Sequence, residues 1–191
     1  MELLIILLPV MAFIALAAGL VVVFRGSGRI AARTRELQQF KGAVKDLALR
    51  ADTLLAAAAR QIDAVRHHQA GPEVIGQTVT EATETLARYG EEARSWAGPR
   101  RAQAIRDDLV GEIERAVRAL GMVEHGADML VSARRGARDL EAQTSIKRGY
   151  LNLIHAREAI ARHAVRAEDL AVDDARSGQN EVRAGRSGSA R

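Results

Sequence analysis

The five histidines are the residues of this chain best suited to hold a metal ion. His125 and Asp128 lie three residues apart, as do His155 and Glu158, so each pair would share one face of a helix. A carboxylate-bridged di-iron bundle needs a Glu-x-x-His pair on each of two helices, with two further inward-facing Glu residues. No Glu-x-x-His sequence occurs here. A metal-binding helical bundle is therefore kept only as an alternative interpretation, and no residue is assigned as a metal ligand.

Catalytic chemistry has few residues to draw on in this sequence. There is no cysteine, which excludes a thiolate nucleophile, a disulfide framework and thiolate metal ligands. The chain also lacks a Gly-x-Ser-x-Gly turn and a glycine-rich phosphate loop followed by Lys-Ser or Lys-Thr. Those sequences place a nucleophile or bind phosphate in common enzyme folds. We therefore expect a protein that is not an enzyme, uses no cofactor and has no small-molecule substrate.

Arginine is abundant, so a membrane-associated nucleic-acid-binding protein is a second alternative. Binding to phosphates needs a net basic face, and binding to single strands also needs exposed aromatic rings for stacking. Acidic residues interrupt the basic runs, as in Arg106-Asp107-Asp108, and aromatic residues make up only 3% of the chain. This mixture is typical of a solvated helix surface with ion pairs one turn apart, and it disfavours nucleic acid as a partner.

An uninterrupted apolar run from Leu3 to Phe24 begins the chain. As a helix it would extend roughly 33 Å, enough to cross the hydrocarbon core of a bilayer. A cleaved signal peptide would carry positive charge before a shorter apolar run, whereas here no Lys or Arg precedes the run. The sequence thus predicts a retained membrane anchor at 1–24, with a basic juxtamembrane joint at 25–35. The joint contains the residues expected to contact lipid headgroups: Arg25, Arg29, Arg33 and Arg35.

The positions of these arginines also predict an orientation. Positive charge tends to remain on the cytoplasmic side of a membrane, so we expect a single-pass protein with its N-terminus outside and its C-terminal body in the cytoplasm. Within the anchor, small residues at Ala12, Ala15 and Gly19 share a face. Such a face allows two membrane helices to approach closely, and it is the predicted site of self-association within the membrane.

The body at 36–172 is predicted to be helical throughout, because its apolar residues recur at intervals of three and four rather than two. Gly71-Pro72 and Gly98-Pro99 interrupt this pattern, as expected for turns between antiparallel helices. The predicted helices cover about 30–69, 72–97 and 99–172, and the last is either one long helix or two with a break near 121–136. Residues 173–191, rich in Ser, Gly and Arg, are expected to form a disordered tail.

The last predicted helix contains two patterns of apolar residues. Ala137, Leu140, Thr144, Leu151 and Ile154 form a candidate buried seam, although Lys147 falls on it. The segment 146–163 also places apolar residues on more than one face, which favours burial on two sides. The candidate partner surface within it consists of Tyr150, Leu151, Ile154 and His155.

Together these features predict an all-α protein: a single N-terminal transmembrane helix followed by an antiparallel bundle of three or four long helices with coiled-coil character. The function that fits best is a membrane-tethered scaffold or accessory subunit. It would act through helix–helix contacts, either with itself or with a protein partner, because an apolar stripe at helical spacing is a common means of recognition.

Overall fold

The computed structural model describes the backbone of residues 2–132 and 139–170, and the side chains of residues 32–132 and 139–170. The described residues form four helices packed against one another and contain no strand. The predicted all-α class is therefore confirmed. The helices are α1 (Glu2–Arg66), α2 (Glu73–Arg94), α3 (Arg100–Ser132) and α4 (Asp139–Glu168).

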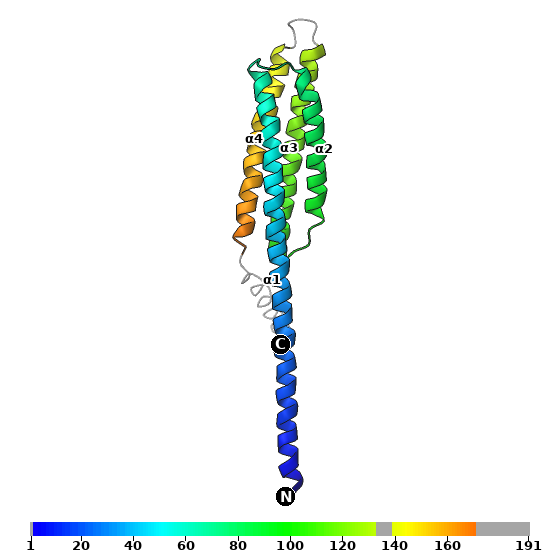
Figure 1. Cartoon of the computed structure of the whole chain (residues 1–191), viewed down its shortest axis with the longest axis vertical. Coiled ribbons are helices and arrows are strands. Elements are labelled where there is room, and N and C mark those ends of the chain that lie inside the picture. Colours follow the sequence, from blue (N-terminus) through cyan, green and yellow to red (C-terminus); the bar gives the residue numbers. More distant parts are fainter. Residues whose placement is uncertain (1, 133–138, 171–191) are drawn as a thin grey trace, which may run out of the picture.

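The helices alternate in direction, and α4 returns to lie beside α1 (Figure 1). The α3–α4 contact is the most extensive, followed by α2–α3 and α1–α4. The N-terminal half of α1 extends alone beyond the other three helices (Figure 1). Because α1 is one helix from Glu2 to Arg66, it includes the predicted joint at 25–35 without a break.

The chain between Pro99 and Val172 forms two helices rather than one. α3 remains helical through Gly121 and Gly126 and ends only at Ser132, so most of the window predicted for the break is helical. The two Gly-Pro pairs lie in the α1–α2 and α2–α3 connections, as their chemistry predicts. Pro72 is the N-cap residue of α2 and Glu73 follows it in the first turn, where a carboxylate interacts favourably with the helix dipole.

The core is aliphatic and contains no buried polar residue within the described part. The buried side chains of α1 recur at intervals of three and four, as predicted, and Leu54 beside them is only half-buried. They include Leu37, Phe40, Val44, Leu47, Ala51, Leu55, Ala58, Ile62 and Val65. At the α2–α3 connection, Phe40 and Trp96 meet edge to face with ring centroids 6.1 Å apart. This aromatic pair closes the end of the bundle from which α1 projects.

Two ion pairs on the flanks hold α1 in register with its neighbours. Arg50 donates to both carboxylate oxygens of Glu92 on α2, at 2.6 and 3.1 Å. Arg157 of α4 donates to Asp52 at 2.5 and 3.2 Å. In each case the hydrogen bond to the carboxylate raises the pKa of the guanidinium. All four side chains are more than a third exposed. These ion pairs therefore add little to the stability of the bundle, and their main effect is to orient α1 relative to α2 and α4.

Glycines allow α3 and α4 to approach more closely than larger residues would. A Cβ atom added to Gly126 would lie 2.8 Å from the carbonyl oxygen of Ala142 and 2.7 Å from the Ile146 side chain. A Cβ atom added to Gly149 would lie 2.7 Å from the carbonyl oxygen of Ala119. Each glycine therefore faces the backbone of the opposite helix, and the two backbones can be this close only because both positions lack a side chain.

We expect Gly126→Ala and Gly149→Ala each to destabilise the bundle by about 1–3 kcal/mol, since the added methyl group forces two backbones apart. Gly121→Ala is the matched control, because its Cβ would have no atom within 4 Å. That change should stabilise α3 by about 0.5–1 kcal/mol. Chemical unfolding of the full chain, followed by circular dichroism, measures all three. Equal effects at Gly121 and Gly126 would contradict the close approach.

A left-handed residue ends α1. His68 has a positive φ of 58°, and within the described part of the chain no other non-glycine residue has one. The amide of Gln69 donates to the carbonyl of Ala64 at 2.8 Å, the hydrogen bond of a Schellman cap. Glycine usually occupies this position, because a Cβ atom makes the left-handed conformation costly.

His68→Gly should therefore stabilise the chain by about 1 kcal/mol by relieving that strain. His67→Gly is the control, because the His67 amide still makes a helical hydrogen bond to the carbonyl of Asp63 at 3.0 Å. Glycine at that neighbouring position should be destabilising instead. Thermal unfolding of the two variants should shift the midpoint in opposite directions, and shifts of the same sign would refute the strain at His68.

Candidate functional site

The residues of the predicted partner surface divide between the inside and the outside of the bundle. The ring of Tyr150 lies under the guanidinium of Arg66 at 4.5 Å, and Ile154 packs against the core. Both side chains therefore make contacts within the bundle and have little surface left for a partner. Leu151 is 45% exposed and His155 is exposed, so these two are free to meet another molecule.

The candidate seam on α4 is wrong at Leu140 and Leu151, which are exposed, whereas Ile154 packs against the core. Ala137 lies outside the described residues. The buried face of α4 is formed by Ala142, Ile146, Gly149, Leu153, Ala156 and Ile160. Leu140, by contrast, is 79% exposed, the most exposed large apolar side chain in the described part. The buried face alternates small residues with Ile146, Leu153 and Ile160, so α3 and α4 pack closely on that face while Leu140 and Leu151 lie outside. Lys147 on that seam was the signal of its exposure.

Leu140, Thr144, Arg148, Leu151 and His155 follow one another on α4 at intervals of four, four, three and four. Residues at these intervals share one helix face. This outer stripe adds Leu140 and Arg148 to the two exposed residues of the predicted surface. It runs along the part of α4 nearest the α3–α4 connection.

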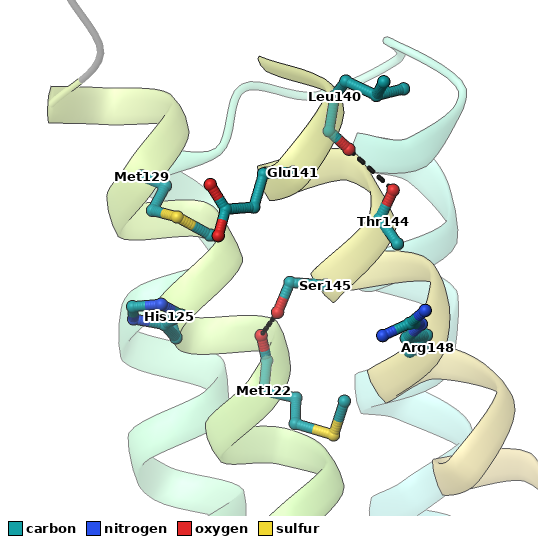
Figure 2. Close-up of a pocket in the computed structure, with 8 residues that line it drawn as sticks. All are labelled: Met122, His125, Met129, Leu140, Glu141, Thr144, Ser145 and Arg148. Carbon is teal, nitrogen blue, oxygen red and sulfur yellow. Dashed lines mark hydrogen bonds between the residues drawn. The ribbon is translucent and has the colours of Figure 1, made fainter. Parts of the chain in front are cut away.

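A groove of about 480 Å³ lies between this stripe and α3. Figure 2 shows the side chains that line it, which come from both helices. We call it the α3–α4 groove. Its residues are Met122, His125 and Met129 from α3, and Leu140, Glu141, Thr144, Ser145 and Arg148 from α4.

The hydroxyl groups in the groove are occupied by backbone hydrogen bonds. Ser145 donates to the carbonyl of Met122 across the helix pair at 2.8 Å, and Thr144 donates to the carbonyl of Leu140 at 2.7 Å (Figure 2). Two methionines and a leucine provide most of the apolar lining. Methionine is flexible and polarizable and is common on surfaces that adapt to a partner. The groove is thus suited to binding rather than to nucleophilic chemistry.

Two features of the described residues bear on metal and nucleic-acid binding. No group of three or more His, Asp or Glu side chains in this part of the chain could hold a metal ion. The aromatic side chains described are all buried or half-buried and so form no stacking platform for bases: Phe40, Tyr89, Trp96 and Tyr150.

A group of charged residues surrounds His163 at the opposite end of the α3–α4 pair. Arg166 donates to Asp108 of α3 at 3.1 Å, and its Nη1 atom lies 3.4 Å from Nδ1 of His163. Burial of the imidazole lowers the pKa of His163; Asp108 and Glu112 oppose this shift, and Arg166 and Arg162 add to it. The neutral imidazole is therefore the form that the folded chain favours.

This environment makes the stability of the bundle depend on pH. The unfolded chain has the ordinary histidine pKa of about 6.5, so between that value and the lower folded pKa the unfolded state binds more protons. Stability should therefore fall as pH decreases through and below 6.5. His163→Gln should make unfolding free energy less dependent on pH between about 5 and 7. Urea titrations at several pH values measure this, and an unchanged slope would exclude His163 as a cause.

The predicted membrane-related sites lie mostly beyond the described side chains. Arg33 and Arg35 are exposed on α1, while Arg25 and Arg29 fall outside the described side chains. The same holds for the small-residue face at Ala12, Ala15 and Gly19, and the tail at 173–191 is also outside the described residues. Among the residues whose side chains are described, which begin at residue 32, no helix is long and apolar enough to cross a bilayer. The anchor at 1–24 and its contacts therefore stay predictions.

Comparisons with protein-family models, with curated proteins and with solved structures gave no match to this chain. No residue role is carried over from another protein. The function is argued below from the sequence and from the geometry of the α3–α4 groove.

Proposed function

We propose that this chain is a membrane-tethered scaffold or accessory subunit that binds a protein partner through the α3–α4 groove. The observation that supports this most is the exposure of Leu140, 79% of whose side chain is open to solvent beside a methionine-lined groove. A large apolar side chain next to an apolar groove gains free energy when a partner covers both.

The partner element proposed is an amphipathic helix. The groove lies between two antiparallel helices, so a third helix can pack its apolar ridge along it as helices do in bundles. Glu141 and Arg148 line the groove beside its apolar residues, which favours a partner helix with charges of both signs flanking its apolar stripe. Leu151 and His155 would extend the contact along α4.

The tether proposed is the apolar run from Leu3 to Phe24. Because α1 continues as one helix to Arg66, the far end of the bundle would stand roughly 60 Å along the helix axis from Phe24. The arginines that follow Phe24 favour a cytoplasmic bundle and an N-terminus outside. The tether would thus hold the groove at a set distance from the membrane and present it to a cytoplasmic or membrane-bound partner.

The groove is tested by charge substitution on exposed positions. Leu140→Glu and Leu151→Glu should each weaken partner binding at least about tenfold, because a carboxylate would be buried in an apolar contact. Leu49→Glu is the matched control, since Leu49 is an exposed leucine of α1 (67% exposed) that is not part of the groove. Site-specific photocrosslinking in intact membranes, with the probe at Glu141, gives the readout.

All three variants should unfold at the same urea concentration as the unaltered chain, because surface substitutions change stability by only about 0.5 kcal/mol. If the crosslinked product is lost equally in Leu49→Glu and Leu140→Glu, the groove is not the site of binding. If no variant changes the crosslinked product, the same conclusion follows.

The tether is tested by removing it. Deletion of residues 2–24 should release the chain from membranes that withstand an alkaline carbonate wash, whereas the full chain should stay in the membrane pellet. The bundle of the truncated chain should keep its helical circular dichroism, because its core begins at Leu37. A full chain that is extracted by carbonate would contradict the transmembrane anchor.

A further inference from the structure

A second cavity, of about 450 Å³, lies where the α1–α2 connection meets the facing ends of α3 and α4. It shares no lining residue with the α3–α4 groove. Lys147 lines this cavity, whereas the next residue, Arg148, lines the groove. The volume is in the range of pockets that enclose small molecules, roughly 300–1,000 Å³. We call it the end cavity.

One wall of the end cavity is apolar. Val65 and Ile146 belong to the buried core, and Leu130 packs against that core. All three side chains also line the cavity. Val65 and Ile146 have little exposed surface of their own, so the free energy gained on binding would come mainly from the apolar group of the ligand and from the half-buried Leu130.

Cationic groups lie beside this wall. Arg66 is held by its contact with the Tyr150 ring and by a hydrogen bond to Asp63 at 2.9 Å. That hydrogen bond uses one of the five N–H donors of the guanidinium, which leaves others for a ligand. Lys147 makes no ion pair within the described residues. An ammonium group that is unpaired within the described residues, beside a partly paired guanidinium, favours an anionic ligand group.

A strained residue also lines the cavity. His68 keeps the left-handed conformation, φ 58°, that glycine would adopt at lower cost. The cap that ends α1 accounts for this conformation. The position of His68 places an imidazole, which can donate to an anion, on the cavity wall.

One acidic residue, Asp139, lines the cavity as well. It lies eight residues before Lys147 on α4, about 12 Å away along the helix axis. Asp139 is thus near the start of α4, whereas the Lys147 end of the cavity is close to Arg66 and Tyr150. The charges are separated along the cavity, so the anionic group of a ligand would lie toward Lys147 and Arg66.

From these observations we infer that the end cavity binds a small organic anion: a carboxylate or phosphate ester carrying a compact apolar group. Lys147 and Arg66 would bind the anionic group, and His68 would donate a further hydrogen bond. Val65, Leu130 and Ile146 would cover the apolar group. The site does not depend on the α3–α4 groove or on a protein partner.

The test measures binding to the full chain in nanodiscs of zwitterionic lipid by titration calorimetry. Phenyl phosphate and phenylacetate are the anionic probes, 2-phenylethanol is the neutral analogue, and inorganic phosphate is the anion without an apolar group. At least one anionic probe should bind with a Kd of about 1 mM or lower, and the neutral analogue and inorganic phosphate should bind at least about tenfold more weakly. The tighter of the two anionic probes shows which acid group is preferred. Equal binding of the neutral analogue, or no binding of either anionic probe at about 10 mM, would overturn the inference.

Two neighbouring variants locate the site. Lys147→Met should weaken binding of the preferred probe at least about tenfold. Arg148→Met, which also removes one exposed positive charge from α4 but lines the groove, should bind the probe as the unaltered chain does. Both variants should keep their helical circular dichroism, because both positions are exposed. Equal affinity of the two variants would place the probe outside the end cavity and refute the proposal.

Discussion

The close approach of α3 and α4 is the constraint on which the rest of the bundle depends. At Gly126 and Gly149 the backbone of one helix lies against the backbone of the other, so small residues occupy the contact and hold it in a single register. Packing of this kind gains dispersion energy from many short contacts rather than from a few large side chains. The large residues Met122, Met129 and Leu140 consequently remain on the outer side of the pair, where they form the α3–α4 groove.

α1 combines two roles in one helix. Its C-terminal half contributes core residues from Leu37 to Val65, and its N-terminal half extends past the other helices (Figure 1). Since no turn separates the halves, the orientation of the projecting half is coupled to the bundle through a continuous hydrogen-bonded backbone. The α1–α2 connection at the end of this helix contains the strained His68, and it brings α1, α3 and α4 together around the end cavity.

Much of the fold follows from the sequence. The Gly-Pro pairs mark two of the connections, and the interval of three and four residues in α1 predicts most of its buried face. The same method fails on α4, because small residues separate Ile146, Leu153 and Ile160 on its buried face, so this face gives no stronger apolar signal than an exposed row with two leucines. Gly126 lies in the window predicted for a break but is inside α3, because sequence alone does not distinguish a glycine that ends a helix from one that lets two helices touch.

The candidate sites were less accessible to sequence reasoning than the fold. Leu151 and His155 were identified as part of a partner surface, but Met122 and Met129 are on another helix and become their neighbours only through the α3–α4 contact. The end cavity combines residues from α1, α3, α4 and a connection, so no local pattern predicts it. For the exposed stripe on α4, Lys147 is the one indication in the sequence, because a lysine on an apparent apolar seam indicates that the seam is exposed.

The central claim is that a partner covers the α3–α4 groove when the chain is in its membrane. The chain has no cysteine, so a single introduced thiol is its only site for a maleimide, and the label is read on the chain after it has been isolated from the membrane. Leu140→Cys should react slowly in native membranes and rapidly after purification, while Leu49→Cys should react rapidly in both. Equally fast labelling of the two variants in native membranes would show that the groove is uncovered and would contradict the account.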